Sequence, residues 1–115
     1  MMIQRIQPGK RYSEAVIANG LVFLSGMVPD NLDADATAQT TNVLAQIDTL
    51  LAELGMTKSR IVDATIYLAD MADYNAMNTA WDLWVEEDQA PARATVEARL
   101  ANPEWKVEIK VTAAL

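Results

Sequence analysis

The stretch Val16-Ile-Ala-Asn-Gly-Leu-Val-Phe-Leu-Ser25 places the pair Asn19-Gly20 between two apolar runs. Both central residues of a two-residue hairpin turn need positive φ, and Asn-Gly is the pair that adopts it most readily. The stretch therefore predicts two antiparallel strands, Val16–Ala18 and Leu21–Ser25, joined as a hairpin. A further short strand is predicted ahead of them, over Ile3–Ile6.

The segment that follows the hairpin has helical periodicity. Between about Thr37 and Leu54, apolar residues recur at steps of three and four, which predicts an amphipathic helix. Asp33 or Asp35 is suited to cap its first turn, and Gly55 is suited to end it. The predicted apolar stripe consists of Val43, Leu44, Ile47, Leu50, Leu51 and Leu54.

Beyond this helix, period-two alternation predicts a strand over Ile61–Ala69. Its expected apolar face consists of Val62, Ala64, Ile66 and Leu68. A second helix is predicted to begin at Asp70 or Asp73 and to run to about Glu87, before Pro91 breaks the pattern. Its apolar stripe consists of Tyr74, Met77, Trp81, Trp84 and Val85, and packing in a core or an interface is the favoured role of the two tryptophans.

Two strands are predicted at the end of the chain, Ala92–Leu100 and Trp105–Ala113, joined by a short link. Polar and apolar residues alternate along both of them. If the two strands pair directly, Arg93 of the first and Glu108 of the second share a face. The pattern alone leaves two readings of Arg93, a solvated charge on a sheet face or the anchor for a substrate carboxylate.

The predicted element order is β-β-β-α-β-α-β-β, which indicates an α+β fold with one mixed sheet and both helices on one face. A length of 115 residues suits one domain over residues 1–115. If the helices cover one face of the sheet, the other face needs either water or a partner subunit.

Composition excludes several kinds of chemistry. The chain has no cysteine and no histidine, which excludes disulfides, thiol nucleophiles, Ser-His-Asp triads and imidazole metal ligands. Acid–base chemistry must use carboxylates, tyrosine, lysine, backbone groups or water. The formal charge of −7 disfavours nucleic acid and anionic membrane surfaces as partners. No apolar run approaches the ~20 residues of a bilayer span and the first residues lack a signal-peptide core, so we expect a cytoplasmic protein.

Four stretches, in order, resemble the RidA (YjgF) family of reactive-imine deaminases, most closely its shorter YoaB-like branch. They are Tyr12 followed by "SGMVP" (Ser25–Pro29), "DATIYLADMADYNAMNTAW" (Asp63–Trp81), "PARATVEARL" (Pro91–Leu100) and "KVEIKVTAAL" (Lys106–Leu115). The resemblance covers essentially the whole chain. It implies a chorismate-mutase-like subunit and a homotrimer, whose sheets pack around a central axis and whose ligand clefts lie between subunits.

The resemblance also implies a reaction. Catalytic branches of the family hydrolyse 2-imino acids, which are in equilibrium with 2-enamino acids, to 2-oxo acids and ammonia without a metal or a cofactor. The standard substrates are 2-iminobutanoate and 2-iminopropanoate. Such imines leave pyridoxal-phosphate-dependent dehydratases and can damage other such enzymes, so the implied role is control of metabolite damage.

The resemblance assigns roles to individual residues. Arg93 matches the arginine that holds the substrate carboxylate, and Glu108 matches the glutamate that positions or activates the attacking water. The residues that match the lining of the cleft are Tyr12, Ser25, Gly26, Asn78 and Thr95. The sequence departs from the family pattern at Thr95, which is often cysteine, at Lys10-Arg11, where Gly-Pro is usual, and at Lys110, where a second glutamate is common.

Two other functions stay open at this point. A trimer of this kind can bind small carboxylates such as 2-oxo acids without turning them over. It can also be a structural or chaperone-like assembly that works through its surface. Ligand binding without ammonia release separates the first of these from the deaminase, and a function that survives Arg93→Ala marks the second.

Overall fold

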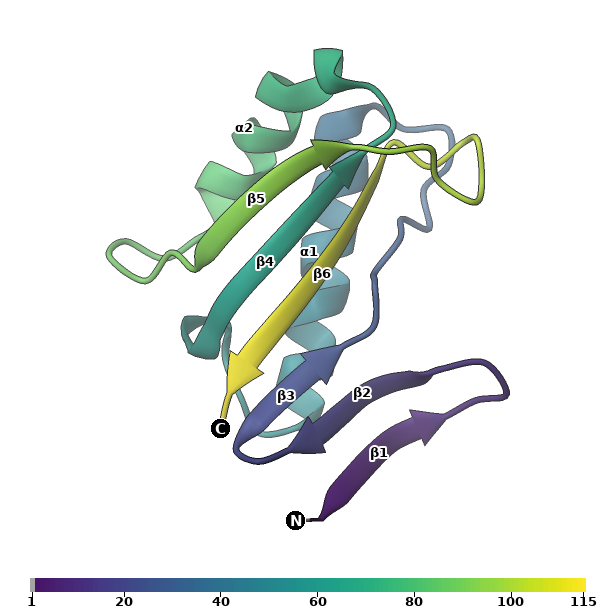
Figure 1. Cartoon of the computed structure of the whole chain (residues 1–115). Helices are drawn as coiled ribbons and strands as arrows, with labels where there is room; N and C mark the ends of the chain where they lie inside the picture. The colour runs from purple at the N-terminus through teal and green to yellow at the C-terminus, as the bar shows by residue number, and fades with distance from the viewer. Residues whose placement is uncertain (1) are drawn as a thin grey trace.

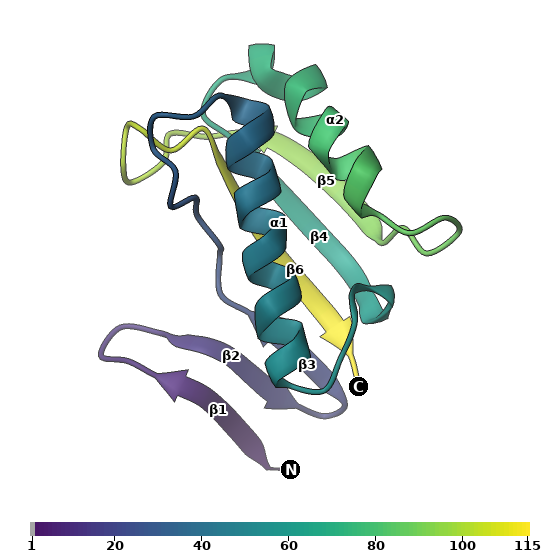
Figure 2. The same cartoon turned by 180° about the vertical axis from the view of Figure 1, so that it is seen from behind.

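The computed structural model describes residues 2–115 and consists of one six-stranded sheet with both helices on the same face (Figures 1 and 2). The predicted α+β fold and its element order are confirmed. None of the helices in residues 2–115 has the length and apolar content needed to cross a bilayer. The strands are β1 (Ile3–Pro8), β2 (Ser13–Ala18), β3 (Leu21–Leu24), β4 (Ile61–Leu68), β5 (Ala92–Glu97) and β6 (Val107–Ala114), the helices are α1 (Ala36–Glu53) and α2 (Tyr74–Trp84), and 3-10 turns span Lys58–Arg60 and Met71–Asp73.

The strands lie in the order β1-β2-β3-β6-β4-β5. The last two strands do not pair directly, because β4 lies between them. Strand β4 is antiparallel to β6 and parallel to β5. A parallel neighbour requires a crossover, and α2 provides it by returning the chain to the edge of the sheet beside β4 (Figure 2).

Local signals placed the first hairpin and the first helix correctly. Asn19 and Gly20 have φ of 52° and 78°, as the two-residue turn between β2 and β3 requires. Asp35 caps α1, where its side chain accepts a hydrogen bond of 2.9 Å from the Ala38 N–H. Gly55 follows the helix with φ of 72°, which is the left-handed conformation expected after a C-terminus.

Two boundaries differ from the sequence prediction. A bulge between Ile61 and Asp63 shifts the register of β4, so Ile61 is buried and Val62 is 47% exposed. Helix α2 ends at Trp84 and does not reach Glu87. Val85 adopts an extended backbone (φ −67°, ψ 137°) and packs against the core, which ends the helix one turn early.

The core fills the layer between the two helices and the sheet. A buried polar residue, Gln39 of α1, ties this layer to the link between β5 and β6. Its side chain donates to the Glu104 carbonyl at 3.0 Å and accepts from the Lys106 N–H at 2.8 Å. Both backbone groups are hydrogen-bonded in this way. The two bonds fix the link where it passes the end of β4 on its way from β5 to β6.

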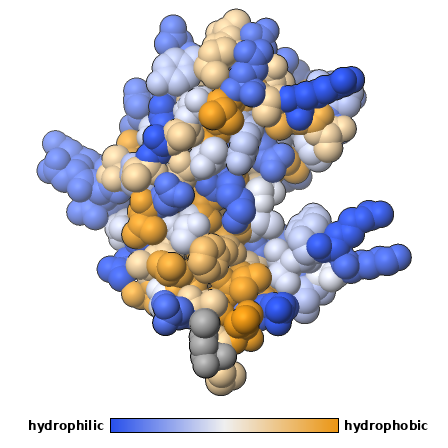
Figure 3. Space-filling view, viewed as in Figure 1, coloured by the Kyte–Doolittle hydropathy of each residue, from blue (hydrophilic) through white to orange (hydrophobic). Residues whose placement is uncertain are grey.

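The face of the sheet that points away from the helices is called the open face below. In Figure 3 hydrophobic side chains on it alternate with polar ones, and they gather over the half formed by β1–β3. Three large apolar residues of this face are exposed, Ile3 (50%), Phe23 (39%) and Val96 (42%). The open face is therefore neither a fully solvated polar surface nor part of the core of this chain.

Candidate functional site

The two residues with the most specific predicted roles lie on opposite faces of the sheet. Arg93 is paired with Ala64, which is fully buried beneath the helices. Glu108 is paired with Tyr67, which is in turn opposite Val96 on the open face. Residues directly opposite on neighbouring strands share a face. The expectation that Arg93 and Glu108 share a face is therefore wrong, and the inserted strand β4 is the reason.

Arg93 lies against one face of α2. Its Nη1 donates to Asn78 Oδ1 at 2.8 Å and its Nη2 donates to the Tyr74 hydroxyl at 3.3 Å. Its guanidinium carbon lies 5.1 Å from the centroid of the Trp81 ring. Positions 74, 78 and 81 are neighbours on one side of a helix, so α2 presents all three groups together. We call Arg93 with these three partners the arginine cluster.

Every partner of the guanidinium in this cluster is neutral. An amide, a hydroxyl and an indole ring orient the planar cation without cancelling its charge. The hydrogen bonds use two of its five N–H donors, which leaves donors for another acceptor. The arrangement can therefore bind a carboxylate through charge-assisted hydrogen bonds.

The Trp81 ring is itself held in place. It packs against Trp84, with ring centroids 5.2 Å apart, and the Trp84 Nε1 donates to the Asp48 carboxylate of α1 at 3.0 Å. Lys58 Nζ lies 5.2 Å from the centroid of the Trp84 ring. This chain of contacts connects the arginine to the long helix, so the position of its guanidinium depends on helix packing as well as on β5.

Thr95 follows Arg93 on the same face of β5. Its Oγ1 is buried and has no hydrogen-bond partner in the chain. A buried hydroxyl without a partner is destabilising by about 1–3 kcal/mol. Thr95 therefore offers an unused donor and acceptor beside the arginine cluster.

A second group of predicted site residues meets on the open face. A Cβ added to Gly26 would overlap Glu108 Oε2 and lie 3.1 Å from Glu108 Cδ. Met27 exchanges two backbone hydrogen bonds with Ile109, at 2.8 and 3.0 Å, which fixes this segment against β6. The glycine at position 26 leaves room for the glutamate carboxylate, which occupies the space that a side chain would fill. Ser25 lies next to it, with its N–H bonded to the Glu14 carbonyl at 2.9 Å.

The chain thus brings the predicted residues together in two groups. Asn78 and Thr95 accompany Arg93, and Ser25 and Gly26 accompany Glu108. Tyr12 belongs to neither group: it stands in the turn between β1 and β2 with 64% of its surface exposed. That turn borders a cavity of about 310 Å³ that Lys10 and Arg11 also line.

Sequence reasoning missed three residues at these groups. Tyr74 and Trp81 were assigned only to an apolar stripe, although their spacing from Asn78 places them on the same side of the helix. Lys110 was noted only as a departure from a family pattern, and its Nζ donates to the Leu24 carbonyl beside Ser25. Arg93 contacts α2 because this helix connects β4 to the parallel strand β5. No local sequence pattern reveals that connection.

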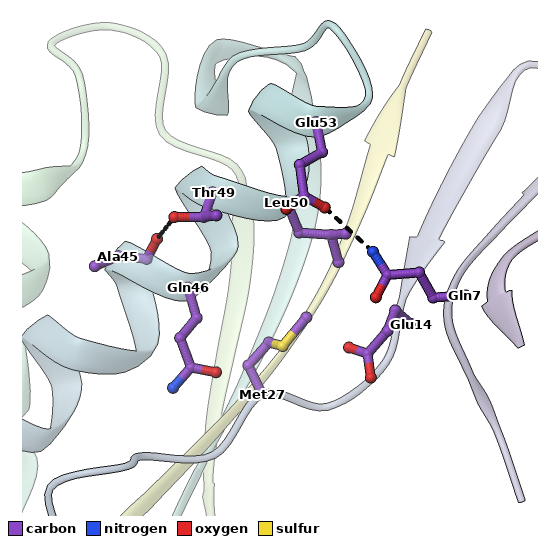
Figure 4. A pocket seen from close by; sticks show the side chains of 8 residues that line it. All are labelled: Gln7, Glu14, Met27, Ala45, Gln46, Thr49, Leu50 and Glu53. Carbon is purple, nitrogen blue, oxygen red and sulfur yellow. Dashed lines mark hydrogen bonds between the residues drawn. The ribbon is translucent and has the colours of Figure 1, made fainter. Parts of the chain in front are cut away.

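A separate cavity of about 320 Å³ lies between α1 and β1–β3. Figure 4 shows Glu14 and Glu53 on its wall, with Gln7 donating to Glu53 at 3.3 Å. It contains none of the predicted site residues. Within residues 2–115, no three carboxylates converge on a point where a metal ion would fit.

Asn78→Ala is expected to release the Arg93 side chain. The variant loses the 2.8 Å contact to Nη1 and keeps the looser contact to Tyr74. The measurement is ¹⁵N relaxation of the Arg93 Nε–H, whose order parameter should fall to the range below about 0.6 that marks a flexible group. Thr79→Ala, a neighbouring substitution on the exposed side of α2, is the control. An unchanged order parameter in Asn78→Ala would show that Asn78 does not position the arginine.

Gly26→Ala is expected to displace the Glu108 carboxylate while changing the free energy of unfolding by less than about 1 kcal/mol. The new methyl group meets the end of a flexible side chain, which can rotate to another rotamer. A crystal structure of the variant and denaturant unfolding check the two expectations. In a Glu108→Ala background the same substitution should have no further effect, and a large loss of stability there would contradict the steric explanation.

Comparison with known proteins places the chain in a family. A family model described as Endoribonuclease L-PSP matches residues 2–115. The RutC family protein YoaB of Escherichia coli (strain K12) is 55% identical over 115 residues, which is all of both chains. NMB1025 of Neisseria meningitidis, a member of the YjgF protein family, is 60% identical with a TM-score of 0.95, over 99% of this chain and 95% of that one. YyfA of Yersinia pestis, from the Rid protein family, is 30% identical with a TM-score of 0.90, over 99% of this chain and 100% of that one. The protein therefore belongs to the RidA/YjgF/L-PSP (RutC) family.

Proposed function

We propose that the protein hydrolyses reactive 2-imino acids, and the 2-enamino acids in equilibrium with them, to 2-oxo acids and ammonia. The observation that carries this proposal is the arginine cluster, a guanidinium held by neutral groups and left with free donors. A planar cation of this kind matches the carboxylate that every 2-imino acid carries. The unpaired Thr95 hydroxyl beside it supplies a further hydrogen bond.

We infer that the complete cleft lies between two copies of the chain. Arg93 and Glu108 are on opposite faces, and their strands are separated by β4, a span of about 9–10 Å between β5 and β6. A three- or four-carbon acid cannot contact both in one chain. In the proposed homotrimer, the edge of one copy that carries Arg93 meets the open face of the next copy. The exposed apolar residues of the open face support its burial by a neighbour.

Glu108 is the proposed base of the reaction. Its carboxylate binds a water and accepts a proton from it as the water oxygen attacks C2 of the protonated imine, and the C=N electron pair moves to nitrogen. The resulting carbinolamine carries a hydroxyl and an amine on C2. Glu108 returns the proton to the amine nitrogen, the C–N bond breaks with release of ammonia, and the C2 hydroxyl passes its proton to solvent as the carbonyl forms. Orientation of the bound acid and one general base supply the rate increase.

The description of the matching family model names an endoribonuclease, and the chemistry of this chain does not favour that activity. RNA cleavage needs contact with phosphates, and the chain carries a net charge of −7. It also contains no histidine, the residue most often used for general acid–base catalysis.

The first test is ammonia release from freshly generated 2-iminopropanoate. The wild-type protein should exceed the buffer rate, and Arg93→Ala should lower kcat/KM about a hundredfold, because the carboxylate loses its charged partner. Arg99→Ala, just past the end of the same strand, is the matched control and should retain activity. Glu108→Gln should lower kcat by about a hundredfold and leave binding of 2-oxo acids intact. A wild-type protein that gives only the buffer rate would exclude the deaminase.

Binding of small carboxylates without turnover is the second candidate function. It is favoured by the completeness of the arginine cluster within a single chain, which needs no contribution from Glu108. Binding of a 2-oxo acid that depends on Arg93, together with no ammonia release, would select this function. Binding and function unaffected by Arg93→Ala would instead point to a structural role of the assembly.

The position of the cleft between copies can be tested by mixing variants. Arg93→Ala and Glu108→Gln chains should each be inactive alone. Unfolded and refolded together in equal amounts, they should recover about one quarter of wild-type activity, because a cleft with Arg93 from one copy and Glu108 from another forms by chance in that fraction. Light scattering should give the mass of three chains. Absence of recovery in mixed trimers would mean that both residues act within one chain.

A further inference from the structure

Lys110 lies on the open face of β6, two residues beyond Glu108. Its Nζ donates to the carbonyl of Leu24, the residue just before Ser25 and Gly26. The Glu108 carboxylate lies against Gly26 in the same segment. The Lys110 ammonium and the Glu108 carboxylate therefore both contact the segment Leu24–Gly26, and the ammonium donates to a backbone carbonyl.

The surroundings of this lysine disfavour its charged form. Partial burial lowers the pKa of Lys110 below its ordinary value, because the ammonium loses hydration. The carbonyl that accepts its hydrogen bond is neutral. A cation in this condition gains from an anion that approaches the open face, since a charge-assisted hydrogen bond is stronger than one to a neutral acceptor.

The spacing of Lys110 and Glu108 suits one particular kind of substrate. Residues i and i+2 on a strand are about 6.6 Å apart and point to the same side. If C2 of an imino acid lies beside the water held by Glu108, a group two or three bonds farther along the carbon chain reaches Lys110. An uncharged alkyl group there would gain nothing from the ammonium, whereas a carboxylate would form a charge-assisted hydrogen bond with it.

We propose that Lys110 binds a second carboxylate of the substrate, so that the site prefers 2-imino dicarboxylic acids over imino acids with alkyl side chains. This inference rests on the proposed function, because it takes the first carboxylate to be bound by Arg93 and the water by Glu108. It adds a specificity that neither of these residues can supply. The same contact would select 2-oxo dicarboxylic acids as bound products.

Lys106 provides a matched control. It is also two residues from Glu108, in the opposite direction along the chain, and carries the same charge. It precedes the start of β6, and its backbone N–H bonds to Gln39 of α1 at 2.8 Å. It therefore lies toward the link to β5 and not beside Ser25 and Gly26, so its removal should leave the proposed contact unchanged.

The test compares two stable ligands with the same five-carbon chain, 2-oxoglutarate and 2-oxopentanoate, by titration calorimetry. The wild-type protein should bind 2-oxoglutarate about tenfold more tightly, a difference of about 1.4 kcal/mol. Lys110→Met should remove this preference and Lys106→Met should keep it. Arg93→Ala should weaken the binding of both ligands by the same factor. The preference should shrink at 0.5 M salt, because added ions screen the contact.

The possible results separate this inference from the proposed function. Equal binding of the two ligands by the wild-type protein, or a preference that survives Lys110→Met, would overturn the role of Lys110 and leave the deaminase standing. A preference lost in Lys106→Met instead would also overturn it. A changed mass of Lys110→Met in light scattering would assign the lysine to assembly and reject the proposal. Failure of both ligands to bind the wild-type protein would count against the carboxylate site itself, and so against the proposed function.

Discussion

Strand β4 is hydrogen-bonded on both sides, antiparallel to β6 and parallel to β5, and this position decides where the candidate residues lie. Its side chains Ala64, Ile66 and Leu68 are fully buried against the helices. Because neighbours across a sheet share a face, the register of β4 places Arg93 beneath α2 and Glu108 on the open face. Had β5 paired directly with β6, the two residues could have formed a site within one chain.

The edge position of β5 explains how an arginine is accommodated on the helix side. A central strand at that position would need an apolar side chain. At the edge, α2 covers only part of the strand, and the residue opposite Arg93 is the small Ala64. The long side chain can therefore pass over the alanine and reach the partners on α2, while its guanidinium stays near solvent. A cation fully inside the core would require an ionised partner.

The sequence was informative wherever structure depends on near neighbours. The Asn19-Gly20 turn and the Asp35 cap follow from φ preference and a side-chain acceptor, which act over a few residues. Alternation along β5 correctly indicated which residues share a face. It could not indicate which face the helices cover, because on an edge strand a polar row can point toward a helix as well as toward water.

The candidate site was less accessible to sequence reasoning because its contacts are distant along the chain. A glycine in a loop usually indicates a turn, yet Gly26 has no positive φ and instead leaves room for the Glu108 carboxylate. Likewise, Asn78 was predicted to line the cleft and contacts Arg93 itself. Family resemblance identified these residues as candidates for the site, and the structure shows which groups each of them contacts.

The separation of Arg93 and Glu108 by the thickness of the sheet has a consequence for the two candidate functions. On the proposed mechanism, a lone chain keeps its carboxylate-binding groups and lacks a water-activating group on the same side. Hydrolysis then requires assembly, and its specific rate falls when the protein is diluted below the dissociation constant of the trimer. In this view the separate chain binds carboxylates, and the assembled chains also hydrolyse imines. An acid bound by Arg93 of one copy and in contact with Glu108 of the next would also stabilise the assembly that makes it reactive, because a ligand that binds the assembled form more tightly than the separate chain shifts the equilibrium toward assembly.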